Sequence, residues 1–145
     1  MATRSRIGIE LPDGSILSVY HHWSGYPEWL GRILKTHYNT KEKVEQLIDG
    51  GDMSSCWTKD TWTRSMRTFE SINNEEYGYG PLYYKDRGED CPPRYDISVK
   101  TYLETGEEYA YIYTLKGEWV CYNRNEFEDD KQPEIVEIPS GALAV

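Results

Sequence analysis

The chain has 145 residues, of which 38% are hydrophobic and 28% charged, and its formal net charge is -9. This length predicts one domain, over residues 1–145, with its own hydrophobic core. No run of apolar residues approaches the roughly 18 that a membrane span requires, so we expect no membrane segment. Proteins that coat DNA or RNA are usually basic, and the charge therefore argues against a long nucleic acid as partner.

The acidic residues are concentrated in the second half of the chain. Residues 1–69 hold nine Lys and Arg against eight Asp and Glu, and residues 70–145 hold the remaining seven against seventeen. A solvated acidic surface that aids solubility is the simplest interpretation of this excess. The aromatic residues are 13 Tyr, 5 Trp and only 2 Phe. Because aromatic residues are enriched at interfaces, this excess predicts a homo-oligomer, a dimer or higher.

Cysteine and histidine spacing gives no sign of a metal centre. Cys56, Cys91 and Cys121 lie far apart, form no C-x-x-C pair and are distant from the three histidines. Structural zinc sites need closely spaced ligand pairs, so we expect neither a metal nor another cofactor. The N-terminus carries no apolar run typical of a secretory signal. Reduced cysteines and a cytoplasmic location are the corresponding expectation.

The first predicted elements are two strands joined by a tight turn. Apolar residues alternate through residues 6–11, and residues 15–23 form a second stretch rich in β-branched and aromatic residues. Pro12-Asp13-Gly14 between them suits a turn, since proline presets φ and glycine accepts a positive φ. The pattern predicts a β-hairpin.

Two short helices are expected next. Pro27 suits the first turn of a helix, and apolar residues recur at helical spacing up to Tyr38. Asn39, with Glu42 three residues later, predicts the capping box of a second helix, which ends at Gly50-Gly51. Because the two helices are short and adjacent, we expect an αα-hairpin packed on the sheet.

The middle of the chain is less regular. Trp57, Trp62, Met66 and Phe69 could form one face of an irregular helix, and residues 71–80 are expected to form a loop. A β-meander is predicted from residues 95–103, 109–115 and 118–122. Residues 126–145 are a polar, acidic tail in which residues 134–138 could add an edge strand.

These elements predict an α+β fold in the order ββ, αα, an irregular middle and βββ. Its antiparallel β-sheet combines the N-terminal hairpin with the C-terminal meander, and the αα-hairpin packs on it.

No sequence motif indicates catalysis. The chain lacks a Gly-x-Ser-x-Gly nucleophile elbow and a glycine-rich phosphate loop, and its carboxylates are too numerous for any pair to stand out. His21 and His22 are neighbours on a predicted strand and point to opposite faces, so they cannot hold one metal together. We therefore expect a protein that is not an enzyme.

Two segments have the composition of a nucleotide-binding site. The first joins a predicted strand to a helix and offers aromatic faces for stacking and a helix N-terminus for an anion. The second combines tyrosines with cations that can pair with a phosphate. The candidate ligand-binding residues are Arg4, Arg6, His22, Trp23, Tyr26, Tyr83, Tyr84, Lys85 and Arg87. The same aromatic residues can instead pack a corner of the fold, and the cations can pair with neighbouring acids.

Several stretches together resemble a set of small bacteriophage proteins. In chain order they are residues 3–9, 13–15, 19–27, 37–38, 43–48, 51–55, 85–89, 108–111 and 117–119. Functionally, the chain is similar to the first type of Thoeris anti-defence sponges and to related anti-CBASS sponges. It departs from that family at Ser24, where the family has Asp, which removes a possible acceptor for a ribose hydroxyl.

This resemblance implies a phage protein of the host bacterial cytoplasm that evades immunity by sequestration. It would bind a nucleotide immune signal, a cyclic ADP-ribose isomer or a cyclic oligonucleotide, without cleaving it. It would also be a homo-oligomer with ligand pockets near subunit boundaries. The alternative is an acidic phage inhibitor that binds a host protein directly, for example by mimicking nucleic acid through residues 126–137 and 104–108.

Overall fold

The computed structural model describes residues 3–56, 81–104, 107–125 and 132–139, and the following statements concern those residues. The predicted N-terminal hairpin is confirmed. Strands β1 (Ser5–Glu10) and β2 (Ile16–His21) pair antiparallel, with Ser5 opposite His21 and Glu10 opposite Ile16. The amide of Leu11 donates to the carbonyl of Ser15, the amide of Gly14 donates to the carbonyl of Leu11, and Gly14 has a φ of 87°. This is a three-residue hairpin loop in which glycine occupies the left-handed position.

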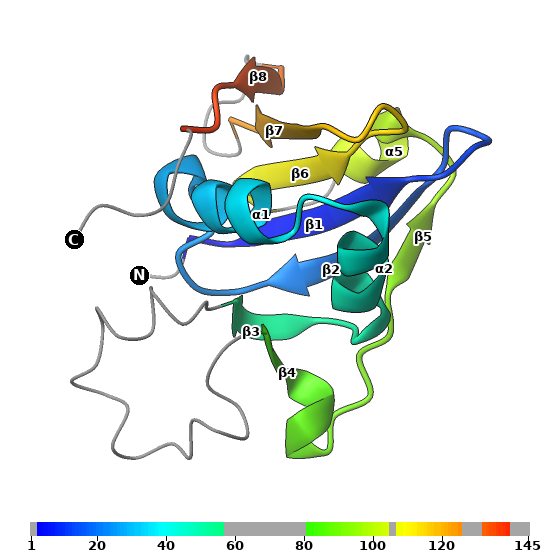
Figure 1. Ribbon diagram of the computed structural model, residues 1–145, viewed down its shortest axis with the longest axis vertical. Coiled ribbons are helices and arrows are strands. Elements are labelled where there is room, and N and C mark those ends of the chain that lie inside the picture. The colour runs from blue at the N-terminus through cyan, green and yellow to red at the C-terminus, as the bar shows by residue number, and fades with distance from the viewer. Residues whose placement is uncertain (1–2, 57–80, 105–106, 126–131, 140–145) are drawn as a thin grey trace.

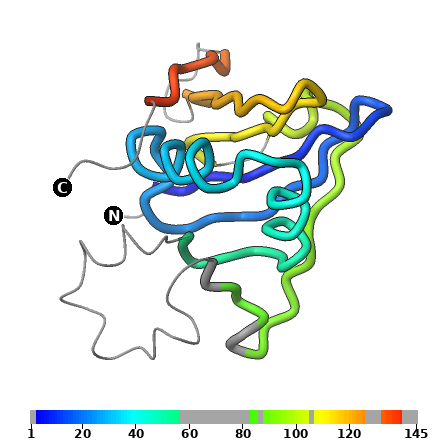
Figure 2. Tube along the Cα trace, in the orientation of Figure 1, coloured from blue at the N-terminus to red at the C-terminus, as the bar shows by residue number. Residues whose placement is uncertain are grey.

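The sheet is mixed, which corrects the expectation of an antiparallel one. Its order is β4-β3-β2-β1-β6-β7-β8, with β5 also paired to β2. Strand β1 runs parallel to β6 (Tyr109–Tyr113), and β2 is parallel to β3 (Met53–Cys56). The N-terminal hairpin therefore lies inside the sheet, between β3 and β6 (Figures 1 and 2). The sequence pattern distinguishes strands from helices, but the direction in which distant strands pair depends on the connections between them.

The outer edge of β2 is shared by two segments. Its C-terminal end meets β3 at His21 and Met53, whereas its N-terminal half pairs antiparallel with β5 (Arg94–Asp96). Between these contacts, the amide of Tyr20 donates to the side chain of Asp52 over 2.8 Å. The carboxylate thus satisfies a backbone donor that neither neighbouring strand reaches.

The predicted αα-hairpin covers one face of the sheet (Figure 1). It consists of a π-helical turn η1 (Pro27–Gly31), which continues into α1 (Arg32–His37), and of α2 (Lys41–Asp49). The N-cap of α2 is Thr40, whose side chain accepts from the amide of Lys43, so the predicted cap at Asn39 is wrong by one residue. Gly50 and Gly51 end α2 as expected, and Gly51 has a φ of 87°.

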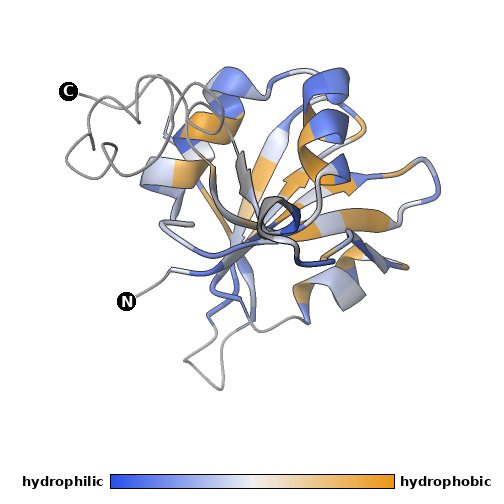
Figure 3. Cartoon of the chain, turned by 90° about the horizontal axis from the view of Figure 1, so that it is seen from below, coloured by the Kyte–Doolittle hydropathy of each residue, from blue (hydrophilic) through white to orange (hydrophobic). Residues whose placement is uncertain are grey.

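The main hydrophobic core lies between these helices and the sheet. Ile7, Val19, Leu34 and Val44 are each 0% exposed and belong to this one cluster. Figure 3 shows hydrophobic residues concentrated between the helices and the strands. The inward residues of β1 and β2 are two apart, and those of α2 are three and four apart, as expected for a strand and a helix facing the same core.

The opposite face of the sheet is covered in part by α5 (Val99–Leu103), which corrects the predicted strand over residues 95–103. Only residues 94–96 form a strand there, β5. Ser98 and Thr101 form a capping box that starts α5, and Tyr102 packs on Ile16, Ala110 and Ile112 in a second, smaller core. The alternation of β-branched residues that favoured a strand here is overridden by the cap.

The C-terminal hairpin is confirmed. Strand β6 pairs antiparallel with β7 (Trp119–Asn123), and β7 pairs with the short strand β8 (Glu134–Val136), the expected edge strand. In the middle of the chain, β4 (Pro81–Tyr83) pairs with β3 and leads into the 3-10 turn η3 (Tyr84–Arg87). The expectations for Trp57 to Phe69, for residues 71–80 and for most of the acidic tail lie outside the described residues.

Candidate functional site

Four of the predicted binding residues gather around Tyr20, close to the C-terminal end of β2. Because Tyr20 is opposite Arg6 in the β1–β2 register, its side chain lies on the face of the sheet away from α1 and α2. The hydroxyl of Tyr20 is 2.6 Å from Nδ1 of His22. The ring of His22 lies edge-on to Trp23, with 4.7 Å between the ring centroids. These residues form a continuous aromatic row.

Arg4 and Tyr84 complete this group, here named the Tyr20 cluster: Arg4, Tyr20, His22, Trp23 and Tyr84. Burial raises the pKa of Tyr20, the nearby Tyr84 hydroxyl raises it further, and the positive charge of Arg4 lowers it. The charge of Arg4 and the hydroxyl of Tyr84 therefore both act electrostatically on the Tyr20 hydroxyl. Arg4 is exposed and Tyr84 is half-buried.

Backbone contacts fix the positions of these side chains. The amide of Tyr84 donates to the carbonyl of Asp52 over 3.2 Å, and the Asp52 side chain accepts from the amide of Tyr20. Asp52 thus joins η3 to β2. The amide of Trp23 donates to the carbonyl of Ser54 over 3.0 Å, while its side chain is 48% exposed. A large aromatic surface is therefore left accessible on an anchored backbone.

After Trp23 the chain turns away from β2, and this turn requires the close packing of Gly25 against the start of β1. Its amide donates to the carbonyl of Thr3, and a Cβ at this position would lie 2.7 Å from that oxygen. Real Cβ atoms do not come so close, so any other residue at position 25 would displace the turn. Ser24 has a positive φ of 57° immediately before it. Gly25 therefore sets the direction from which Trp23 emerges.

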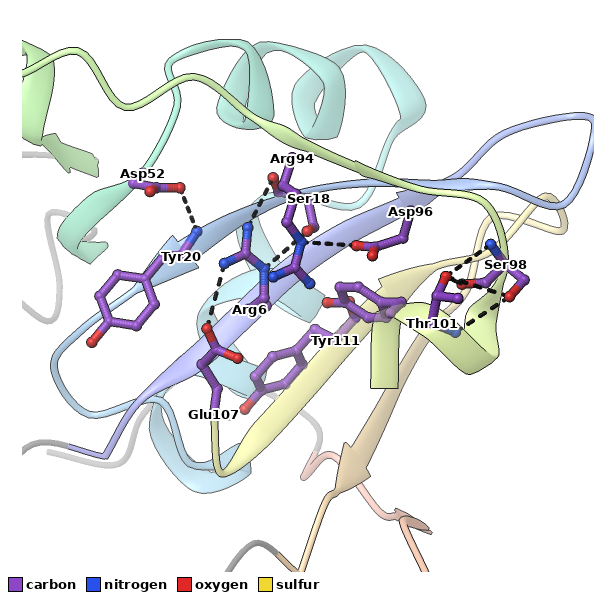
Figure 4. A network of polar contacts seen from close by, with 11 residues as sticks. Arg6, Ser18, Tyr20, Asp52, Arg94, Asp96, Ser98, Thr101, Glu107 and Tyr111 are labelled. Carbon is purple, nitrogen blue, oxygen red and sulfur yellow. Dashed lines mark hydrogen bonds and ion pairs between the residues drawn. The ribbon is translucent and has the colours of Figure 1, made fainter. Parts of the chain in front are cut away.

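Arg6 is buried next to the Tyr20 cluster and has protein partners. Its Nε donates to the hydroxyl of Ser18 over 3.0 Å, and Nη1 lies 3.4 Å from Oε1 of Glu107 (Figure 4). Only 7% of the Arg6 side chain and 13% of the Glu107 side chain are exposed. The structure thus gives Arg6 a structural ion pair, with no open face for a ligand.

A second charged pair lies beside the first. Nε of Arg94 donates to Oδ2 of Asp96 over 3.0 Å (Figure 4). Among the described residues, buried Nη2 of Arg94 and buried Oε2 of Glu107 have no hydrogen-bond partner. Arg94 and Glu107 each form an ion pair through another atom, so the interior between β2, β5 and the Arg6 side chain is polar. A buried water could bridge the two remaining atoms, one a donor and the other an acceptor.

The second predicted segment is divided between two places. Tyr84 joins the Tyr20 cluster, whereas Tyr83 turns toward α2. The hydroxyl of Tyr83 donates to the carbonyl of Leu47 over 2.6 Å, and its ring lies so close to Gly50 that no side chain fits there. Nζ of Lys85 lies 5.1 Å from the centre of the Tyr83 ring. The side chain of Arg87 lies outside what the structure describes.

The predicted anion site at a helix N-terminus receives no support from the local geometry. Tyr26 is 36% exposed and precedes η1. The amides of Trp29 and Leu30 both donate to the carbonyl of Tyr26, and Pro27 has no amide hydrogen. The amides of Trp29 and Leu30 are therefore already satisfied, and the ring of Tyr26 is exposed beside them.

The remaining reactive groups show little catalytic character. Burial raises the pKa of the Cys56 and Cys121 thiols to about 12, which keeps both protonated at neutral pH. Burial, with a smaller effect of His22, lowers the pKa of His21 to about 3. Within the described ranges, no group of three or more His, Cys, Asp and Glu is arranged to hold a metal ion.

The sequence analysis named Arg4, His22, Trp23 and Tyr84 of the Tyr20 cluster as candidates but did not name Tyr20, or Asp52, whose contacts position the cluster. A signal for Tyr20 was present, because residues two apart on a strand share a face and Tyr20 therefore had to lie beside His22. No local signal marked Asp52, which reaches β2 from the end of the helical crossover.

Comparison with protein-family models, with curated proteins and with solved structures finds no match for this chain. Among the described residues, no helix has both the length and the apolar character needed to cross a bilayer.

Proposed function

We propose that this protein binds a small anionic nucleotide at the Tyr20 cluster and holds it without cleaving it. The observation that carries the proposal is the exposed Trp23 ring, which is anchored through its backbone and continuous with His22 and Tyr20. The positive charge of Arg4 acts on the same Tyr20. An aromatic face stacks on a base, and an arginine pairs with a phosphate in a bidentate manner. Neither interaction requires a reaction.

The wider biological proposal is sequestration of an immune signal by a phage protein in the host cytoplasm. It rests on the resemblance to anti-defence sponges, and the ligand would then be a cyclic ADP-ribose isomer or a cyclic oligonucleotide. A sequestering protein needs affinity without turnover, which agrees with the protonated cysteines and the absence of a catalytic motif. The acidic second half does not oppose an anionic ligand, since salt screens charges beyond about 8–10 Å.

The test is calorimetry and thermal shift of the full chain against a panel of cyclic oligonucleotides and ADP-ribose isomers. A true ligand raises the melting temperature and is recovered intact, by mass spectrometry, after the protein is denatured. Chemical conversion of the ligand by the pure protein would instead identify an enzyme. No binding to any member of the panel would contradict the proposal.

Matched variants locate the site. Trp23→Ala and Arg4→Ala should each weaken binding by about tenfold or more, because base stacking and a phosphate contact are each worth about 1–3 kcal/mol. Leu115→Ala is the control for Trp23, since Leu115 is also exposed (59%) but lies beyond the opposite end of β1. Lys41→Ala, at the start of α2, is the control for Arg4. Equal losses in the controls would place the site elsewhere.

The alternative function, direct inhibition of a host protein through an acidic surface, makes a different prediction. Charge reversal at Glu104 and Glu108 should abolish such inhibition and leave nucleotide binding unchanged. Glu107, in the same acidic stretch, already pairs with Arg6, so it contributes little free negative charge to that surface.

A further inference from the structure

Within the part of the chain that the structure describes, no strand pairs with the outer edge of β5. The hairpin determines which residues of β2 form backbone hydrogen bonds to β1. Because the Leu11 amide donates to the Ser15 carbonyl, the odd-numbered residues of β2 direct their N–H and C=O groups toward β1. The even-numbered residues of β2 direct their backbone N–H and C=O groups away from β1, as the bond from the Tyr20 amide to the Asp52 side chain shows. Arg94 and Asp96, opposite Ser18 and Ile16, therefore bond to β2, and Tyr95 directs its N–H and C=O away from the sheet.

This edge is only partly protected against strand addition: β5 is three residues long, follows Pro93 and carries the charged Arg94 and Asp96, but its outward backbone groups are left unpaired by the described residues. Among the described residues, no group hydrogen-bonds to the backbone of Tyr95 or Ile97. The side chain of Tyr95 is 56% exposed and that of Ile97 is 71% exposed. In Figure 1, β5 lies on the outside of the sheet beyond β2. Tyr95 and Ile97 thus give this edge exposed apolar surface, and unpaired backbone groups at such an edge attract another strand.

The sequence of β5 is complementary to itself. In an antiparallel pair centred on Tyr95, Arg94 lies opposite the partner's Asp96, and Asp96 lies opposite the partner's Arg94. Tyr95 then lies opposite the partner's Tyr95, in the position where each N–H meets the other carbonyl. Opposite charges meet at both outer pairs, and aromatic rings meet at the centre. This charge complementarity favours a second copy of the chain over an unrelated peptide.

We propose that two copies of this protein associate through antiparallel β5–β5 pairing about a twofold axis at Tyr95. The pairing joins the two sheets across their β5 edges and covers Tyr95 and Ile97. It is short, because Ile97 lies opposite the partner's Pro93, which has no N–H to donate. The interface is independent of the Tyr20 cluster, so it holds whether or not the protein binds a nucleotide.

The first test is the mass of the full chain in solution, by sedimentation or light scattering over a concentration series. The native protein should reach twice the chain mass of 17.0 kDa. Tyr95→Glu should weaken association by about tenfold or more, because two like charges then lie directly opposite each other. Leu115→Glu is the matched control, since Leu115 is similarly exposed (59%) but lies outside β5. It should associate like the native protein.

A mixing experiment separates the proposed pairing from simple damage to the fold. Arg94→Glu and Asp96→Lys should each be monomeric, since each places like charges opposite each other at both outer pairs. An equimolar mixture should form a heterodimer, detected by energy transfer between labelled chains. In the heterodimer, the new Glu at position 94 lies opposite the new Lys at position 96, and the native Asp96 of the first variant lies opposite the native Arg94 of the second. Mixing does not restore the Arg94–Asp96 pair within either chain, so unfolded variants would not recover.

Hydrogen exchange provides a measurement on the native chain alone. The Tyr95 amide should become protected as concentration rises, whereas the Tyr20 amide, already bonded to Asp52, should be protected throughout. A strictly monomeric native chain at about 100 µM, a weak-association concentration, would overturn the proposal. So would a dimer that Tyr95→Glu leaves unchanged.

Discussion

The two faces of the sheet are covered by different kinds of buried side chains. Toward α1 and α2, β1 presents Ile7 and Ile9 to an almost entirely apolar core. Toward the other side, the same strand presents Arg6 and Gly8, and the space over Gly8 is filled by the ring of Tyr102. One face gains stability by burying apolar side chains away from water, and the other combines a smaller apolar core with a buried ion pair.

This difference indicates which face tolerates substitutions and which face can support a ligand site. An apolar core accepts substitutions that preserve volume, whereas a buried ion pair fails when either partner is lost. The Tyr20 cluster lies at the open end of the polar face, next to Arg6. A polar interior beside an exposed aromatic row is a rigid support for a ligand with charged and aromatic parts.

The largest expected effect is the loss of the buried cation. Arg6→Ala leaves Glu107 without its partner in a site that is only 13% exposed, and Ser18 loses a donor. We expect the free energy of unfolding to fall by about 3–5 kcal/mol in a urea titration. The double variant Arg6→Met with Glu107→Leu should recover most of this loss. If the single variant is as stable as the native chain, the polar face contributes no such constraint.

The next effect is a loss of stability in mild acid through His21. Burial lowers the pKa of His21 to about 3 from 6.5, so the folded protein binds fewer protons than the unfolded chain. Stability is therefore complete above pH 6.5 and falls as the pH decreases from there toward 3. Between pH 7 and pH 5 we expect a loss of about 2 kcal/mol, since one pKa unit corresponds to about 1.4 kcal/mol.

The control for the acid effect is His21→Gln, which removes the titrating group. Thermal melts of this variant should vary much less between pH 7 and pH 5 than those of the native chain. An identical pH profile in both proteins would assign the acid sensitivity to other groups.

A smaller effect is expected where α5 meets the sheet. The hydroxyl of Tyr102, which is 0% exposed, donates to the carbonyl of Tyr111 over 2.7 Å. Tyr102→Phe retains the ring over Gly8 and leaves that carbonyl without this donor, so it should cost about 1–3 kcal/mol in chemical denaturation. A neutral result would mean that a water replaces the hydroxyl.

The smallest effect should come from a conservative change on the apolar face. Ile7→Val removes one methylene from a fully buried residue that neighbours Arg6 on the same strand. We expect a loss of about 0.5–1.5 kcal/mol in the same titration, because the core can partly relax around the space. If Ile7→Val destabilises more than Arg6→Ala, the contrast between the two faces is reversed.

The candidate site was predictable to the extent that its residues are local in the chain. His22 and Trp23 belong to one strand end, and the aromatic composition of that segment already indicated stacking. Tyr83 and Tyr84 are adjacent in sequence and have the same side chain, yet one caps α2 through Leu47 and the other lies near Tyr20. Their separation is decided by the change from β4 to η3 between them.

The sequence by itself determined both hairpins, the two helices over the core and the stop at Gly50 and Gly51. Those features depend on alternation, helical spacing and turn chemistry, which act between residues close in the chain. Only the tertiary structure decided the parallel pairing of β1 with β6, the division of the β2 edge between β3 and β5, and the meeting of Arg4, Tyr20 and Tyr84. The physical reason is that strand pairing offers equivalent backbone partners in either direction, and the choice falls to the connections and to the packing of distant residues.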